Sequence, residues 1–224
     1  MGLPEYERIA NTVRKSGPAR SANIASIEES AATEEVTALY DSFRTHFGRQ
    51  DVPGILKCFA THPPLLKHMM DLSESLIFAE GALTRKHKEM IATLISEQNV
   101  SPYCADSHGY FLRIHGASVQ TLLAIQSNDL CSSALSESEQ ALLRFVRKVD
   151  DNSHEVSRAD VEKVQQGGWN ELQIAEAVHV AALFATFNRV ANAFGLKSQG
   201  LLALYDEGDG AGHSDVTVSH GSSQ

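Results

Sequence analysis

The stretch from Thr84 to Gly116 constrains the fold most, because its pattern indicates two helices joined by a tight turn. Apolar residues recur at helical spacing over the first segment, Thr84 to Gln98. The second helix is expected to begin at Ser101-Pro102, since serine is a preferred N-cap and proline has no N–H to lose at the first helical position. Asn99 and Val100 complete the break. This stretch therefore predicts a helical hairpin.

Three side chains that carry chemistry fall on this hairpin. Cys104 lies in the first turn of the second helix, where the helix dipole favours a thiolate, so we expect a lowered thiol pKa. His108 follows four residues later, on the same helix face. Glu89 lies roughly 13 Å before the end of the first helix and His108 roughly 10 Å after the start of the second, at about 1.5 Å per residue. A folded hairpin would thus align a nucleophile, a base and an orienting group.

These residues resemble the motif of AhpD-like alkylhydroperoxidases in the carboxymuconolactone decarboxylase superfamily, a glutamate, then Cys-x-x-Cys, then a histidine four residues on. Glu89, Cys104 and His108 match this motif, but Ser101 stands where the motif has its first cysteine. The resemblance covers about Glu34 to Leu204, and its last helix is similar to that of the peroxidase-related branch. It implies an all-α fold, an AhpD-like helical bundle with a central helix hairpin carrying the motif.

The resemblance also implies an antioxidant peroxidase, an oxidoreductase that reduces alkyl hydroperoxides with a thiol. Cys104 would attack the peroxide, His108 and Glu89 would relay its proton, Ser101 would support the site and Tyr103 would line the substrate pocket. No cofactor or metal is implied. The expected partners are a hydroperoxide substrate, an external thiol or carrier protein as reductant, and further copies of the chain in a homo-oligomer, a trimer or hexamer. With Ser101 in the motif, no disulfide can close across the turn.

Several other interpretations stay open. The superfamily also includes cofactor-free carboxymuconolactone decarboxylases, although that branch lacks the Cys and His pair. Glu89, Cys104 and His108 would supply three ligands, the number that a catalytic zinc site uses. A third alternative is that the chain is not an enzyme but a helical interaction protein with a degenerate redox site. In that case Cys104 is an inert buried thiol and Glu89 pairs with Arg85 or Lys86.

Composition limits the classes of partner. A net charge of -9 without a dense Lys/Arg patch argues against nucleic acid as the main partner. No apolar run approaches the length of a membrane span, so no membrane partner is expected. The 3 cysteines are too sparse and odd in number for a disulfide framework, and Cys58 and Cys131 read as structural. They fit a reducing compartment, so we expect a cytoplasmic protein.

The remainder of the chain shows no period-two alternation, which supports an all-α fold. We expect an N-terminal arm over residues 1–30, the helical domain over 31–205, and a disordered Gly-, Ser- and Asp-rich tail over 206–224. Further helices are expected from Thr33, from Asp51 to His62, Leu65–Glu80 closed by Gly81, Val119–Gln126, Ser136–Val149, Ser157–Gln166 and Glu171–Phe194. The last should be central, and its Asn188 and Arg189 are expected at the site or at a subunit contact.

Overall fold

The computed structural model describes residues 23–208, and this part of the chain contains helices and no strand. The all-α prediction is confirmed. The main helices are α2 Glu34–Phe47, α3 Gly54–Phe59, α4 Pro63–Ser73, the π-helix Glu74–Phe78, α5 Arg85–Gln98, α6 Pro102–Ile114, α7 Val119–Gln126, α8 Glu137–Asn152, α9 Arg158–Gln166, α10 Glu171–Phe194 and α11 Leu201–Gly208. Short 3-10 turns lie at Glu29–Ala31 and Ser153–Glu155.

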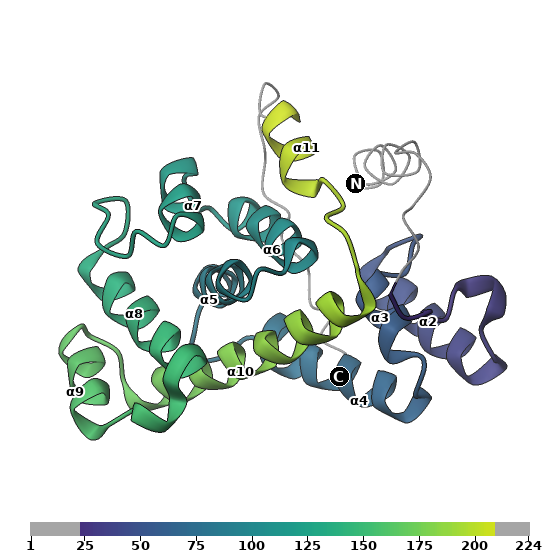
Figure 1. Ribbon diagram of the computed structural model, residues 1–224, viewed down its shortest axis with the longest axis horizontal. Helices are drawn as coiled ribbons and strands as arrows, with labels where there is room; N and C mark the ends of the chain where they lie inside the picture. The colour runs from purple at the N-terminus through teal and green to yellow at the C-terminus, as the bar shows by residue number, and fades with distance from the viewer. Residues whose placement is uncertain (1–22, 209–224) are drawn as a thin grey trace, which may run out of the picture.

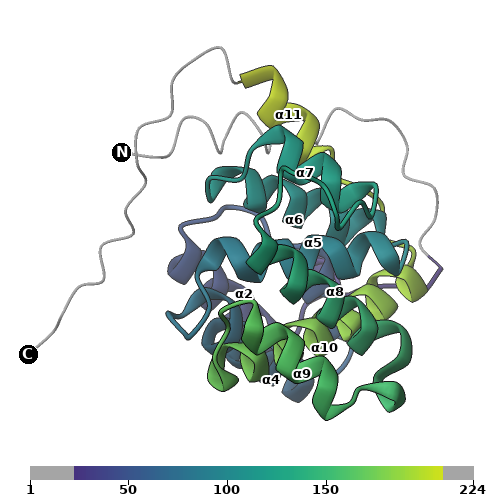
Figure 2. The ribbon, with the colours of Figure 1, turned by 90° about the vertical axis from the view of Figure 1, so that its left-hand side faces the viewer.

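Helix α5 is the centre of the fold, as the family resemblance implies for the hairpin, and α10, which was expected to be central, packs against it. Figure 1 shows it nearly end-on, with α6 on one side and α10 running across the other. It packs against α6, α10, α8 and α7, and every residue from Lys88 to Ser96 is buried. Seen from the side in Figure 2, α8, α9 and α10 lie together on one side of this central hairpin. Charged residues of α5 therefore need partners within the protein interior.

The turn of the hairpin is held by α10. Val100 has a φ of 50°, a left-handed conformation that is unusual for a β-branched residue. The Asn192 side-chain amide donates to the carbonyls of Asn99 at 3.1 Å and of Val100 at 3.3 Å. One turn earlier, Asn188 is fully buried, with its amide 3.0 Å from Ser96 Oγ. Asn188 therefore fixes the end of α5 from inside, whereas Arg189 is exposed.

Helix α10 is the only helix among the described residues that is long and apolar enough, by length and composition alone, to cross a membrane. It packs against α5, α8, α3 and α6. Core helices of globular proteins pass the same test. Its capping box at Asn170 and the left-handed Gly195 at its end match the predicted bounds.

The helix expected over Leu65–Glu80 differs in the structure. It begins earlier, at Pro63, because both prolines occupy the first turn, where no backbone N–H is needed. It then passes into the π-helix Glu74–Phe78 and ends before Gly81. Gly81 is therefore not its cap. A Cβ at Gly81 would lie 2.1 Å from Glu176 Oε1, so glycine is needed for the close approach of that carboxylate.

Glu176 fixes the loop before α5 by two contacts. It accepts from the Leu83 N–H at 2.8 Å and pairs with Lys88 Nζ at 2.8 Å. Lys88 is 1% exposed and also donates to the Ala79 carbonyl at 3.0 Å. This buried pair therefore ties the end of the π-helix to α5 and α10.

The two ends of the described chain lie against the body. In the segment 23–30, Asn23 N–H donates to the Phe194 carbonyl at 3.0 Å and Ile27 N–H to the Lys57 carbonyl at 3.1 Å. The remainder of the expected arm, residues 1–22, lies outside the described residues. Helix α11 continues to Gly208, beyond the expected start of the tail at Asp206, and residues 209–224 lie outside the described part.

Candidate functional site

The hairpin brings Glu89 of α5 and His108 of α6 into direct contact. His108 Nδ1 lies 2.7 Å from Glu89 Oε2, which confirms that the two residues stand at the same height. The Glu89 side chain is 0% exposed and the His108 side chain 18% exposed. The carboxylate therefore orients the imidazole from behind and leaves Nε2 as the ring nitrogen for other partners.

Arg85 completes this group. It lies one turn before Glu89, and its Nε donates to Glu89 Oε1 at 2.6 Å. Its guanidinium also lies over the Phe78 ring, 4.6 Å from the centroid. Burial raises the pKa of Glu89, but His108 and Arg85 outweigh it, so the pKa is lowered overall. Glu89 is thus a carboxylate at neutral pH, with Arg85 and His108 as simultaneous partners.

Cys104 is buried in the first turn of α6, at 4% exposed. Burial raises the pKa of the Cys104 thiol, although the Ser101 and Asn188 side chains act to lower it. The prediction of a lowered pKa is therefore wrong. The helix N-terminus acts over one turn, whereas desolvation by the surrounding walls disfavours the thiolate more strongly. A neutral thiol becomes a strong nucleophile only when it loses its proton, so a reaction at Cys104 would need a base.

We expect the alkylation of Cys104 to have a pH midpoint above about 8.5, the value of an ordinary cysteine. The measurement is the iodoacetamide rate against pH in a Cys58→Ala, Cys131→Ser variant, read by mass. Cys131 in the wild type is the internal comparison, since it is exposed whereas Cys58 is buried. A midpoint at or below that of Cys131 would show that the helix terminus outweighs burial.

Ser101 occupies the N-cap position of α6, but its hydroxyl makes no cap hydrogen bond. Ser101 thus holds the N-cap position expected from the sequence, but it does not cap the helix through its side chain. The backbone is held instead by Ser101 N–H donating to the Ser96 carbonyl at 2.9 Å. The buried hydroxyl has no partner with hydrogen-bond geometry among the described residues, yet it lies near enough to the sulfur to favour the thiolate.

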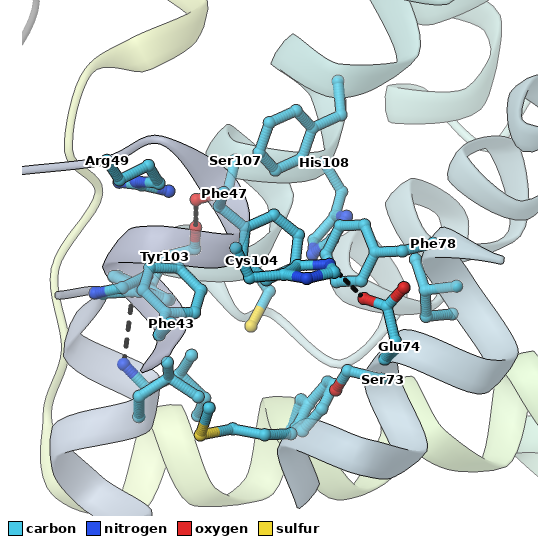
Figure 3. A pocket seen from close by; sticks show the side chains of 18 of the residues that line it. Phe43, Phe47, Arg49, Ser73, Glu74, Phe78, Tyr103, Cys104, Ser107 and His108 are labelled. Carbon is cyan, nitrogen blue, oxygen red and sulfur yellow. Dashed lines mark hydrogen bonds and ion pairs between the residues drawn. The ribbon is translucent and has the colours of Figure 1, made fainter. Parts of the chain in front are cut away.

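Cys104, His108 and Tyr103 share the wall of one cavity of about 380 Å³. Figure 3 shows the Cys104 sulfur directed into the space that the labelled side chains surround. Tyr103 is held there by Ile55 N–H, which donates to its hydroxyl at 3.4 Å. Glu89 and Ser101 do not line the cavity. Among the described residues, no hydrogen bond joins either ring nitrogen of His108 to the sulfur of Cys104.

The opposite side of the cavity is formed by segments that no sequence pattern connected with the site. Phe43 and Phe47 of α2 face it, as do Glu74 and Phe78 of the π-helix. The i, i+4 spacing of Phe43 and Phe47 was a signal, but the same spacing is typical of any core-facing helix. The π-helix itself has no sequence signature, although such segments often occur at functional sites.

Other predicted candidates are not brought together. Within residues 23–208, no group of three or more His, Cys, Asp or Glu side chains is arranged to hold a metal ion. The metal alternative for Glu89, Cys104 and His108 therefore has no suitable donor set. Burial raises the pKa of Cys58 to about 12, and Cys131 is exposed beside Arg144. All three cysteines are free.

Comparisons with known proteins place the hairpin within a known family match and the chain within a known fold. Residues 63–147 match the carboxymuconolactone decarboxylase family. One similar crystal structure is described as an alkylhydroperoxidase AhpD core, an uncharacterized peroxidase-related protein from Ralstonia eutropha JMP134. Its sequence is 24% identical and its TM-score is 0.73, and the match covers 83% of this chain and 96% of that chain. The chain therefore contains a segment that matches this family, and it shares its fold with the AhpD core structure.

Two other structures share this AhpD-like fold. An uncharacterized peroxidase-related protein from Silicibacter sp. TM1040 has 24% identity and a TM-score of 0.69, with 81% of this chain and 93% of that chain covered. The debrominase Bmp8, as a C82A variant in complex with 2,3,4-tribromopyrrole, has 16% identity and a TM-score of 0.66, with 82% and 96% covered. No curated protein matches the chain. At these identities the structures establish the AhpD-like fold only. The reaction must be argued from the residues of this chain.

Proposed function

We propose that this AhpD-like protein reduces organic hydroperoxides at the thiol of Cys104. The observation that carries the proposal is the placement of His108. Glu89 holds it at 2.7 Å from behind, and His108 shares the wall of one cavity with Cys104. A nucleophile, a base and an orienting carboxylate are the parts that covalent thiol chemistry uses.

The reaction begins with the neutral thiol that burial favours. His108 Nε2 takes the thiol proton, and the sulfur attacks the distal oxygen of the hydroperoxide. The O–O bond breaks, the sulfur keeps the OH as a sulfenic acid, and the alkoxide receives the proton from His108 to leave as an alcohol. Glu89 stabilises the imidazolium between these two transfers. Sulfur loses two electrons and the peroxide gains them.

The second half of the cycle needs an external thiol. Ser101 has no sulfur, so no disulfide closes across the turn. A first thiol condenses with the sulfenic acid to give a mixed disulfide and water, and a second thiol releases Cys104 and leaves as a disulfide. Such thiols are abundant in a reducing compartment, and we keep the cytoplasm as the proposed location. Assembly of protomers into a homo-oligomer also stays a prediction.

The test is hydroperoxide consumption by the purified protein with dithiothreitol as reductant. We expect consumption above the dithiothreitol blank in wild type and none in Cys104→Ser. Cys131→Ser is the matched control, because that cysteine is exposed and lies outside the cavity. It should keep the wild-type rate. Equal rates in Cys104→Ser and wild type would overturn the proposal.

A further inference from the structure

We infer that the cavity binds an uncharged compound with an aromatic ring, so that the preferred substrate is an arylalkyl hydroperoxide. The reaction in this inference rests on the proposed function, whereas the binding of the ring does not. Three features of the cavity support the inference: its size, the arrangement of its rings and the pairing of its charged groups.

The cavity is much larger than the peroxide group needs. Its volume is about 380 Å³. One water occupies about 30 Å³ of liquid, and cavities that hold organic ligands start at about 300 Å³. Hydrogen peroxide is close to water in size and would contact only a small part of the wall. A ligand with a ring and a short side chain fits this volume.

The walls consist largely of aromatic rings on two sides. On the side of α2 and the π-helix, Phe47 lies 4.8 Å from Phe43 and 4.7 Å from Phe78, measured between ring centroids. On the opposite side, Phe184 lies edge-on to the His108 ring at 4.4 Å and to Phe187 at 5.8 Å. The sulfur of Cys104 points into the space that such side chains surround (Figure 3).

Such rings favour a further ring over an aliphatic group of equal size. Aromatic pairs prefer edge-to-face or offset contacts with centroids 4.5–7 Å apart, and they gain energy beyond the buried area. The rings of this cavity already adopt such contacts with one another. A bound ring would extend the pattern from α2 to α10.

The charged groups of the wall each have a partner. Arg49 pairs with Asp51 at 3.0 Å, and His46 Nε2 lies 3.0 Å from Glu74 Oε2. His108 is held by Glu89, and Asp71 pairs with Lys67 at 2.6 Å. A charged ligand would need to break one of these pairs or lose its hydration without compensation. An uncharged ligand meets no such cost.

The test measures binding without any peroxide group. The probes are 2-phenyl-2-propanol and 2-cyclohexyl-2-propanol, which share the same alcohol and differ in a flat or a puckered ring. Protection of Cys104 from alkylation gives the dissociation constant of each. We expect the phenyl compound to bind about 3- to 10-fold more tightly, as one or two ring contacts would provide. Equal or tighter binding of the cyclohexyl compound would overturn the inference, as would absence of protection by either compound.

A pair of variants locates the effect. Phe47→Leu removes a ring of the cavity, and Phe194→Leu makes the same change at the end of α10, outside the cavity wall. Phe47→Leu should reduce the phenyl preference to less than about 2-fold, while Phe194→Leu keeps it. Circular dichroism checks that both variants fold. If either fails to fold, the comparison of the two probes on the wild-type protein still tests the inference. An unchanged preference in folded Phe47→Leu would contradict the assignment of the ring site.

The probes also separate this inference from the proposed function. If 2-phenyl-2-propanol binds and protects Cys104 but no hydroperoxide is consumed, the ring site stands and the peroxidase reaction fails. If hydroperoxides are consumed while neither probe binds, the reaction stands and the ring site fails. The corresponding substrate pair, cumene hydroperoxide and its cyclohexyl analogue, should show the same preference in kcat/KM.

Discussion

Replacing His108 with alanine is expected to lower the rate at which Cys104 reacts with a hydroperoxide by about 10²- to 10⁴-fold, the range for loss of a general acid–base group. The reason is the state of the thiol. Burial raises the pKa of Cys104, so little thiolate forms at neutral pH without a base in the cavity. Stopped-flow kinetics of a single turnover give the rate directly. His115→Ala is the matched control, because that histidine is exposed at the end of the same helix.

Glu89→Gln should also reduce this rate, since glutamine does not stabilise the imidazolium that forms on His108. The Glu89 side chain is 0% exposed, and a glutamine of the same length would still reach Arg85 and His108. The matched control is Glu97→Gln, which makes the same change two turns later on α5. A pH profile distinguishes proton transfer from structural damage. In His108→Ala the rate should recover as the pH rises toward the thiol pKa, because hydroxide then replaces the base. A loss that stays constant with pH would show a structural role only.

Ser101→Cys is expected to change how Cys104 is resolved. The Ser101 hydroxyl is buried and lies near the Cys104 sulfur. It makes no cap bond, so its replacement removes no hydrogen bond from the start of α6. A thiol at this position would be placed to condense with the sulfenic acid, giving water and a disulfide. Peroxide-treated Ser101→Cys should therefore lose two hydrogens in mass and take up no sulfenic-acid trap.

The matched control for this variant is Ser96→Cys. Ser96 is also buried, but it lies on α5 and its hydroxyl is engaged by Asn188. We expect Ser96→Cys to keep the trap in place of a disulfide. If Ser101→Cys folds and still takes up the trap, residue 101 does not reach the sulfur. A disulfide from Cys104 to Cys58 or Cys131 in wild type would show instead that a distant cysteine resolves the sulfenic acid.

The central hairpin was predictable because its signals are local. Thr84 caps α5, proline opens α6, and the apolar spacing over Met90 to Ile95 gives a buried face. The contact of Glu89 with His108 followed from helix rise alone. The position of Ser101 at the N-cap was predictable too, although the direction of its hydroxyl was not.

The predictions that failed concern properties that depend on contacts between distant segments. The pKa of Cys104 is set by burial among residues of α3, α6 and α10, and nothing in the sequence around Cys104 reports it. One aromatic side of the cavity is formed by α2 and the π-helix, which precede the motif along the chain. The sequence pattern indicated that Gly81 is a helix cap, but glycine is needed there because the side chain of Glu176, far away in sequence, lies against it. Local pattern therefore gave the helices and the motif, and tertiary contacts decided the chemistry of the thiol.

The most direct measurement of the central claim is the mass of wild-type protein after one equivalent of cumene hydroperoxide, with and without the sulfenic-acid trap dimedone. We expect one trap molecule per chain, located on Cys104 by peptide mapping, with Cys58 and exposed Cys131 unmodified. Loss of the trap in Cys104→Ser completes the assignment. Modification of Cys131 alone, or no trap on any cysteine while the peroxide remains, would contradict the account.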